Sequence, residues 1–228
     1  MNKRVFIAMS GGIDSSVAAM LLLEQGFDLV GVTFRTFDSI KESCIAKEKG
    51  CCSVESIMEA KHLAEQLGFE HHILDFRDTF RQHVIANFVE EYSHGRTPNP
   101  CVLCNSHIKW GKLLEAADKY GCDMIATGHY ARIAERDGHF FLRKAADTRK
   151  DQTYFLWMLT EDNLRRTIFP LGDFTSVANA VNGNRNNASK MFLCFICFYL
   201  RPLWVINVLT VSLNSSSLSS CSMLRCIR

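Results

Sequence analysis

A run of small and polar residues near the amino terminus has the composition of a phosphate-binding loop. Two adjacent glycines, Gly11 and Gly12, follow the apolar run 5–7 and precede a helical pattern that continues to Gln25. Glycines let the backbone turn sharply, and the N–H groups of a first helical turn attract anions. Hydroxyl donors in the same run are Ser10, Ser15 and Ser16. The pattern predicts a strand, a tight turn and a helix start that cradle a phosphate.

This loop differs from the two common phosphate-binding patterns. No Gly-Lys-Ser/Thr follows, as a Walker loop requires, and the three spaced glycines of a dinucleotide-binding turn are missing from the sequence. Asp14 stands where a Walker loop carries its cation, so we expect Mg²⁺ to neutralise the phosphates. The alternative is an ordinary strand-to-helix turn capped by serine.

A second candidate for chemistry is the cysteine pair Cys101 and Cys104. It ends a stretch, 95–105, that contains two prolines, and each proline pushes the preceding residue out of helical geometry. We expect a rigid loop there and a helix over 106–120, whose dipole lowers the pKa of a nearby thiol. Half of a zinc site or a redox pair are the alternatives. A structural zinc needs four ligands, and the adjacent pair 51–52 is too closely spaced to complete such a site.

The elements that must position these residues follow an α/β pattern. A strand, a helix and a second strand within about thirty residues form a βαβ unit, which predicts a parallel sheet. Strands are predicted over 5–7, 28–34, 71–75 and 124–127, and helices over 54–67, 78–92 (capped by Asp78), 106–120 and 154–159. Asp137-Gly138 between 131–135 and 139–144 is typical of a hairpin turn.

Composition limits the class of protein. With 228 residues and 47% hydrophobic content, the chain can bury one good core. The net charge is only +2, so contact with a nucleic acid must come from a local basic patch. A disulfide scaffold is normally smaller and has no sizeable core, so we expect the ten cysteines to be reduced thiols. No secretory signal precedes the first strand. We therefore expect a cytoplasmic protein.

The composition changes after Gly172. Residues 171–228 carry five basic residues and a single acid, with apolar blocks at 191–200 and 203–211. The Arg-Pro pair at 201–202 makes a membrane span over 191–213 unattractive. We expect a catalytic domain over 1–170 and a truncated or aberrant tail over 171–228, from a shifted reading frame or a divergent end.

Four strings together resemble one family of the ATP pyrophosphatases, the tRNA-specific 2-thiouridylases. They are Ser-Gly-Gly-Ile-Asp-Ser at 10–15, Gly-Arg-Thr-Pro-Asn-Pro-Cys-Val-Leu-Cys-Asn at 95–105, Ala-Thr-Gly-His-Tyr-Ala at 126–131 and Lys-Asp-Gln-Thr-Tyr-Phe-Leu at 150–156. The resemblance spans roughly 3–172; the first string is shared by all ATP pyrophosphatases, whereas the second and fourth are specific. It implies a doubly wound parallel sheet, Rossmann-like and similar to the adenine nucleotide alpha hydrolases.

The resemblance also implies roles for individual residues. ATP contacts are implied for Ala8, Met9, Ser10, Gly11, Gly12, Ile13, Asp14, Ser15, Phe34 and Gly128. Contacts with tRNA are implied for Asn99, Pro100, Cys101, His129, Lys150, Asp151 and Gln152. Cys104 is the implied catalytic thiol, and Cys194 the implied persulfide carrier, with Cys197 as its rival. Taken alone, Phe34 is as well explained by core packing, and Lys150 by a solvated charge beside a helix cap at Asp151.

The implied reaction needs ATP and Mg²⁺. ATP adenylates the 2-oxygen of the wobble uridine of tRNA. A persulfide sulfur, delivered by a donor protein, then replaces AMP. Cys104 either activates the site or resolves the persulfide into a disulfide. The family's C-terminal β-barrel has no counterpart in the tail, so the C-terminal extension is incomplete. Another adenylating ATP pyrophosphatase and a non-catalytic remnant that binds ATP or tRNA are the alternatives, and a membrane-anchored protein is disfavoured.

Overall fold

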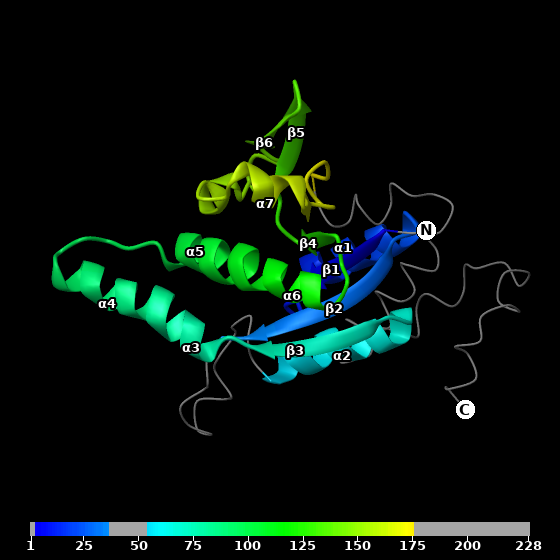
Figure 1. Ribbon diagram of the computed structural model, residues 1–228, viewed down its shortest axis with the longest axis horizontal. Coiled ribbons are helices and arrows are strands. Elements are labelled where there is room, and N and C mark those ends of the chain that lie inside the picture. The colour runs from blue at the N-terminus through cyan, green and yellow to red at the C-terminus, as the bar shows by residue number, and fades with distance from the viewer. Residues whose placement is uncertain (1–2, 37–53, 176–228) are drawn as a thin grey trace, which may run out of the picture. The chain divides into compact units, whose positions relative to one another are not determined.

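The computed structural model describes residues 3–36 and 54–175, which belong to one compact unit (Figure 1). Residues 37–53, with the cysteine pair 51–52, lie outside the described residues. So does the sequence after residue 175, with Cys194, Cys197 and the apolar span 191–213. The predicted domain boundary after residue 170 therefore stays a prediction.

The centre of the fold is a five-stranded, wholly parallel sheet in the order β3-β2-β1-β4-β7. Its strands are β1 (Arg4–Ala8), β2 (Asp28–Arg35), β3 (Glu70–Asp75), β4 (Met124–Thr127) and β7 (Thr167–Ile168). The four predicted strands are confirmed to within one or two residues at each end. Three of them are short, mostly apolar runs, whereas 71–75 has two apolar residues of five. The two-residue edge strand β7 was not predicted.

Helices cover both faces of this sheet, which confirms the doubly wound α/β fold. The connections β1-α1-β2 and β2-α2-β3 step in one direction, through α1 (Ile13–Glu24) and α2 (Val54–Leu67). The chain then returns past β1 to β4. Because crossovers between parallel strands are right-handed, the helix that precedes β4 lies on the face of the sheet opposite to α1 and α2 (Figure 1). Predicted bounds for α1 and α2 match closely, because glycine follows each helix with a positive φ.

A continuous helical run follows β3 and begins earlier than predicted. It comprises α3 (Arg77–Phe80), the π-helical η2 (Arg81–Ile85) and α4 (Ala86–Ser93). Asp78 lies inside the first turn, and Phe76 is the N-cap residue, so the predicted cap at Asp78 is wrong. The carboxylate that acts here is Asp75, whose Oδ1 accepts the backbone N–H of Arg77 at 3.2 Å. Gly95, with φ of 72°, follows the end of the run, which lies within one residue of the predicted end at 92.

The helix before β4 also begins earlier than predicted, at Pro100 instead of Ser106. Its parts are α5 (Pro100–Leu103), the π-helical η3 (Cys104–Lys112) and α6 (Leu113–Lys119). Pro100 occupies the first helical position, where its fixed φ suits a helix and its missing N–H costs nothing. Both candidate cysteines therefore lie on the helix and not in the loop before it.

The hairpin is confirmed, with β5 (Arg132–Arg136) antiparallel to β6 (His139–Arg143) and φ of 54° and 79° at Asp137 and Gly138. The predicted helix over 154–159 is wrong. The chain forms only a 3₁₀ turn, η4 (Thr153–Leu156), because a capping box at Thr160 starts a separate helix, α7 (Glu161–Arg165), immediately afterwards. Leu156 is buried, whereas Tyr154 and Trp157 are 69% and 65% exposed.

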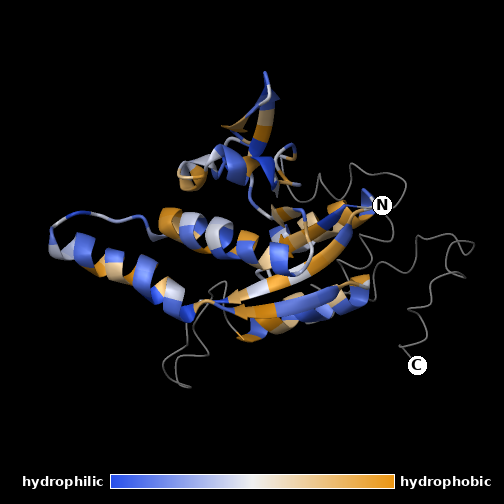
Figure 2. Cartoon of the chain, viewed as in Figure 1, coloured by the Kyte–Doolittle hydropathy of each residue, from blue (hydrophilic) through white to orange (hydrophobic). Residues whose placement is uncertain are grey.

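The main core lies between the sheet and the helix formed by η3 and α6. Phe6, Val30 and Ile125 point from three strands against Trp110 and Leu113. Val5 and Ile7, which alternate with Phe6, are fully buried as well, as both faces of a covered parallel sheet require. Figure 2 shows the hydrophobic colouring concentrated on these strands. No helix within residues 3–36 and 54–175 is long and apolar enough to span a bilayer.

Candidate active site

The site lies where the strand order reverses. From β1 the chain moves to β2 on one side of β1, whereas β4 pairs with β1 on the other side. The loops after β1 and β4 therefore diverge at the carboxyl ends of these two parallel strands. Ala8 and Thr127, the last residues of these two strands, are in register. Ligands of open parallel sheets bind in such a crevice at the carboxyl ends of the strands. The topology thus brings the glycine loop beside Gly128 and His129.

The glycine loop is fixed from the side of β2. Thr33 Oγ1 donates to the carbonyl of Met9 at 2.8 Å, and the Met9 N–H donates to the carbonyl of Val32 at 2.8 Å. Gly11 has φ of 74°, and a Cβ there would lie 2.2 Å from the carbonyl oxygen of Ser56 in α2. Position 11 accepts only glycine, because both the backbone conformation and the approach of α2 exclude a side chain.

The serines of the loop divide into two kinds. Ser15 Oγ and Ser16 Oγ donate to the carbonyl of Gly12 at 2.9 and 3.0 Å, and both residues are buried. Ser10 is exposed, and its Oγ accepts the N–H of Gly12 at 3.4 Å. Helix α1 has no side-chain N-cap, so the N–H groups of its first turn are left for an anion. Ser15 and Ser16 shape the turn, and Ser10 presents its hydroxyl.

Gly128 has a structural role that differs from the expected one. A Cβ at this position would lie 2.8 Å from the backbone nitrogen of Ser15 and 3.0 Å from its Cα. The first turn of α1 therefore packs directly on the loop after β4. The predicted close approach of adenosine to Gly128 stays a prediction, while the close approach of α1 already requires glycine there.

Three side chains from distant parts of the chain meet at Asp14. The Tyr130 hydroxyl donates to Asp14 Oδ1 at 3.0 Å, and Lys150 Nζ donates to the Tyr130 hydroxyl at 3.1 Å. The ammonium also lies 3.6 Å from Asp14 Oδ1. Burial raises the pKa of Tyr130, and the hydrogen bond with Tyr130 raises the pKa of Lys150. At neutral pH the tyrosine is therefore neutral and the lysine charged.

The turn that carries Lys150 is held by its two following residues. Gln152 Oε1 accepts the N–H of Tyr130 at 2.9 Å, and the Gln152 N–H donates to the carbonyl of Tyr130 at 2.9 Å. Asp151 accepts the N–H of Ala145 at 2.8 Å and the Thr153 hydroxyl at 2.6 Å. Asp151 is not the cap of η4, whose N-cap residue is Gln152. The predicted contacts of this turn with tRNA stay predictions.

His129 is held by polar partners on both ring nitrogens. Lys109 Nζ donates to Nε2 at 3.4 Å, so Nδ1 carries the proton and donates to Thr127 Oγ1 at 2.8 Å. Burial, together with the Lys109 charge, lowers the pKa of His129 well below its usual value. His129 is therefore neutral, and its role in binding tRNA stays a prediction.

The cysteine helix points its amino-terminal end toward the same edge of the sheet. A helix that precedes a parallel strand runs antiparallel to it, so Cys101 and Cys104 lie on the side where the strands end. Cys101 is exposed and Cys104 partly exposed; both are reduced thiols, as is Cys122. The neighbouring Asn105 donates to the carbonyl of Phe155 at 2.9 Å, which ties this part of the helix to the turn after Gln152.

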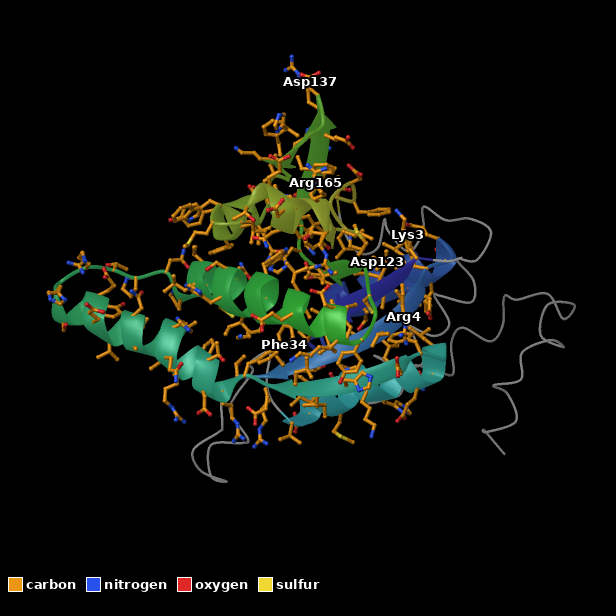
Figure 3. The ribbon with its side chains drawn as sticks, viewed as in Figure 1. Lys3, Arg4, Phe34, Asp123, Asp137 and Arg165 are labelled. Carbon is orange, nitrogen blue, oxygen red and sulfur yellow. The ribbon has the colours of Figure 1, made fainter. Side chains whose placement is uncertain are left out.

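Asn99 and Pro100 stand at the start of this helix. Asn99 is its N-cap residue, with extended backbone angles, and Pro100 is the first helical residue. Both residues are partly exposed, and so is Lys109, which lies further along the same helix in η3. Phe34, which is labelled in Figure 3, is the penultimate residue of β2 and packs on the core. Its ring centroid lies 5.5 Å from that of Phe76. These contacts support the core-packing role of Phe34, and its contact with adenine stays a prediction.

The donor set at the loop suits a hard cation bound together with a ligand. Among residues 3–36 and 54–175, no group of three or more His, Cys, Asp and Glu side chains is arranged to hold a metal. The Asp14 side chain is 47% exposed, and both of its contacts fall on Oδ1. One carboxylate with phosphate oxygens and water fits Mg²⁺, which keeps most of its ligands from outside the protein.

Sequence reasoning missed Tyr130 and Lys109. Tyr130 belongs to the string 126–131, but nothing in that string shows that its hydroxyl reaches Asp14 in α1. Lys109 lies in a helical pattern and reads as a surface charge until β4 brings His129 beside it. For Tyr130 the one signal in the sequence was its place just after the predicted strand 124–127, and for Lys109 there was none.

Comparisons with known proteins point to one family. The family model of the tRNA methyl transferase HUP domain matches residues 3–194. A protein of Amoebophilus asiaticus named tRNA-specific 2-thiouridylase MnmA is 54% identical over 172 residues, which are 75% of this chain and 46% of that protein. A protein of the same name from Cytophaga hutchinsonii is 53% identical over 169 residues, 74% of this chain and 46% of that protein. The chain spans about half the length of the curated relatives it matches.

A solved structure, described as a predicted subunit of tRNA methyltransferase from Methanocaldococcus jannaschii, is also similar. It has a TM-score of 0.45 and 19% sequence identity, and the match covers 82% of this chain and 74% of that chain.

Proposed function

This chain belongs to the tRNA methyl transferase HUP-domain family, and we propose that it is a tRNA-uridine 2-sulfurtransferase, which thiolates the wobble uridine of tRNA with the help of ATP. The observation that carries the proposal is the register of Ala8 with Thr127 at the strand-order reversal, which joins the phosphate loop to the 127–130 segment at one crevice. The names of the two relatives at 54% and 53% identity support the choice of substrate.

The nucleotide half of the site is assigned to the loop after β1. ATP lies with its phosphates over residues 8–15, where the uncapped first turn of α1 and the Ser10 hydroxyl donate hydrogen bonds. Phe34 and Gly128 flank the adenosine. Mg²⁺, held by Asp14 and the phosphates, neutralises charge on the triphosphate. The 2-oxygen of uracil attacks the α-phosphorus, the bond to the bridging oxygen breaks, and pyrophosphate leaves with the electron pair.

The sulfur half is assigned to the cysteine helix and to a cysteine in the tail. The outer sulfur of a persulfide on Cys194, loaded by a donor protein, attacks C2 of the uridine, and AMP leaves with the electrons of the C–O bond. The Cys104 thiolate then attacks the inner sulfur, so that a Cys104–Cys194 disulfide forms and the thiocarbonyl keeps the outer sulfur. A cellular thiol reduces the disulfide. Cys197 is the rival of Cys194 as the carrier.

Binding of tRNA is assigned to two segments at the same edge of the sheet. Asn99, Pro100 and Cys101 hold the target base, and His129 with the turn 150–152 contacts the neighbouring tRNA backbone. In this proposal residues 1–170 form the catalytic domain, 171–228 form a separate tail, and the protein acts in the cytoplasm. The tie between Asn105 and the carbonyl of Phe155 supports the placement, because it joins the two segments.

The proposal predicts that Cys104→Ser abolishes thiolation. The full chain is incubated with ATP, Mg²⁺, tRNA and a persulfide donor, and thiouridine is measured by mass spectrometry of the digested tRNA. We expect the substitution to lower the rate by roughly a thousandfold or more, because the reacting thiolate is lost, with ATP affinity unchanged. The matched control is Cys122→Ala, since burial raises the pKa of that thiol to about 11 and keeps it unreactive.

Thiolation that survives in Cys104→Ser contradicts the role of Cys104. A wild-type chain that binds ATP but never thiolates tRNA contradicts the enzymatic proposal as a whole and favours a nucleotide-binding function. Formation of a different adenylated product assigns the chain to another branch of the ATP pyrophosphatases.

A further inference from the structure

The phosphate loop contains no basic residue of its own, yet a cation stands beside it. Residues 8–16 carry neither lysine nor arginine. Lys150, which follows the hairpin far along the chain, brings its Nζ to 3.6 Å from Asp14 Oδ1. A Walker loop places a lysine against the phosphates from within its own turn. Here the equivalent charge comes from a separate segment.

The ammonium is aimed by Tyr130. The tyrosine ring is only 2% exposed, and Lys150 Nζ lies 4.5 Å from its centroid while donating to its hydroxyl at 3.1 Å. The same hydroxyl donates to Asp14 Oδ1 at 3.0 Å, so one fixed group holds both charges. A lysine side chain that is otherwise flexible is thereby directed to the first turn of α1.

The backbone that carries Lys150 is fixed as well. Gln152 exchanges two hydrogen bonds with Tyr130, and Asp151 accepts the N–H of Ala145. The two residues that follow Lys150 thus hold the turn, and Lys150 is the residue that the turn presents to the loop. The direction of its side chain follows from the fold and not from a chance rotamer.

An ion pair as exposed as this one contributes little to stability. The Lys150 and Asp14 side chains are 42% and 47% exposed, and solvent screens such pairs. An ammonium has three N–H donors, and its contacts with the described residues use those that face Tyr130 and Asp14. Because the Lys150 side chain is 42% exposed, its ammonium keeps the capacity to donate to a ligand bound over the first turn of α1.

We propose that Lys150 contacts the pyrophosphate end of ATP bound at residues 8–15. The identity of the nucleotide rests on the proposed function; the position of the ammonium does not. Lys150 stabilises the negative charge that collects on the departing pyrophosphate, by electrostatic attraction and without giving up a proton. The turn 150–152 then lies between the two substrates, with its ammonium in the nucleotide site.

The test compares Lys150→Met with Arg149→Met in the full chain. Each variant removes one positive charge and keeps a long apolar stem, but Arg149 is 90% exposed and pairs with Asp147. Dissociation constants for ATP and for AMP are measured by titration calorimetry with Mg²⁺ and without tRNA, and tRNA affinity is measured separately. We expect Lys150→Met to weaken ATP binding by about 10- to 100-fold, as for loss of a charged hydrogen bond, and AMP binding by less than about twofold.

Arg149→Met should change neither nucleotide affinity, and Lys150→Arg should restore most of the ATP affinity. Unchanged ATP affinity in Lys150→Met, an equal loss for ATP and AMP, or a wild-type chain that does not bind ATP overturns the inference. A chain that fails to thiolate tRNA, yet loses ATP affinity selectively in Lys150→Met, overturns only the proposed function. Should Lys150→Met fail to fold, Tyr130→Phe decides: a selective loss of ATP affinity supports the inference, and equal affinity with the wild type overturns it.

Discussion

At His71 a single imidazole links the sheet to the phosphate loop. Thr33 Oγ1 already donates its proton to the carbonyl of Met9, so it accepts from His71 Nε2 at 2.9 Å, and Nε2 carries the proton. His71 Nδ1 is buried and has no hydrogen-bond partner among the described residues. Burial, with the charges of His72 and Lys61, lowers the pKa of His71 to about 4. The neutral ring is therefore part of the support of Met9.

This pKa predicts a loss of stability in mild acid. Because the pKa of His71 is about 4 in the folded chain and 6.5 in the reference state, the unfolded chain takes up the proton first as the pH falls. The contribution of His71 is complete above pH 6.5 and is lost toward pH 4; we expect about 1–2 kcal/mol, since solvent reaches part of the ring. Urea unfolding of wild type and His71→Gln between pH 7 and 4 measures it.

The difference between the two pH profiles isolates His71, because burial lowers the pKa of His129 too and gives both proteins a shared dependence. His62→Gln is the matched control, since it removes a histidine whose side chain is 56% exposed. Parallel profiles for wild type and His71→Gln would contradict the assignment.

Among the elements, α1 and β4 depend on each other through one residue without a side chain. The first turn of α1 rests on Gly128, where a Cβ would meet the Ser15 nitrogen at 2.8 Å. These are backbone atoms, which cannot swing aside as a side chain can. The direction in which the N–H groups of α1 point is therefore set by the loop after β4, a part of the chain more than a hundred residues later.

Gly128→Ala should consequently displace the amino-terminal end of α1. We expect ATP affinity to fall by about tenfold or more, because a shift of the donors by a fraction of an ångström misaligns them, and stability to fall by about 1–3 kcal/mol from overpacking. Gly111→Ala is the control: its Cβ would meet its nearest contact, the Ser106 carbonyl oxygen, only at 3.4 Å. Nucleotide titration and urea unfolding measure both effects. Wild-type ATP affinity in Gly128→Ala would show that α1 is not held in this way.

At the scale of the whole described unit, a buried polar link joins the helix layer to the edge of the sheet. Trp110 Nε1 in η3 donates to Thr167 Oγ1 in β7 at 2.8 Å, and the same hydroxyl donates to the carbonyl of Asn163 at 2.6 Å. Trp110 is 2% exposed and Thr167 5% exposed, so neither group can turn to water. The short strand β7 is thus attached to the helix that carries Cys104.

Thr167→Val should destabilise the protein by about 1–3 kcal/mol, since it leaves the indole N–H buried without an acceptor. In a Trp110→Phe background, where that donor is already gone, the same substitution should cost distinctly less. A double-mutant cycle from urea unfolding midpoints measures the coupling. If Thr167→Val costs the same in both backgrounds, the Trp110–Thr167 bond does not carry the effect.

The local elements of this protein could be predicted because their signals are local. Three of the four predicted strands are short, mostly apolar runs, glycines follow α1 and α2, and Asp137-Gly138 marks the hairpin turn. The errors were local too: Asp75 replaces Asp78 as the carboxylate at a helix start, and Pro100 opens a helix that was expected at Ser106. The two-residue strand β7 was too short to leave a pattern.

By itself the sequence determined the α/β class, the turn at Gly11 and Gly12 and the segments that carry the candidate residues. These features depend on the order of residues along the chain. Only the tertiary structure decided which of them meet. The parallel pairing of β1 with β4 brings Tyr130 and Lys150 to Asp14 and places α1 against Gly128. Long-range strand pairing has no local signature, so no pattern in the loop itself revealed that its cation comes from Lys150.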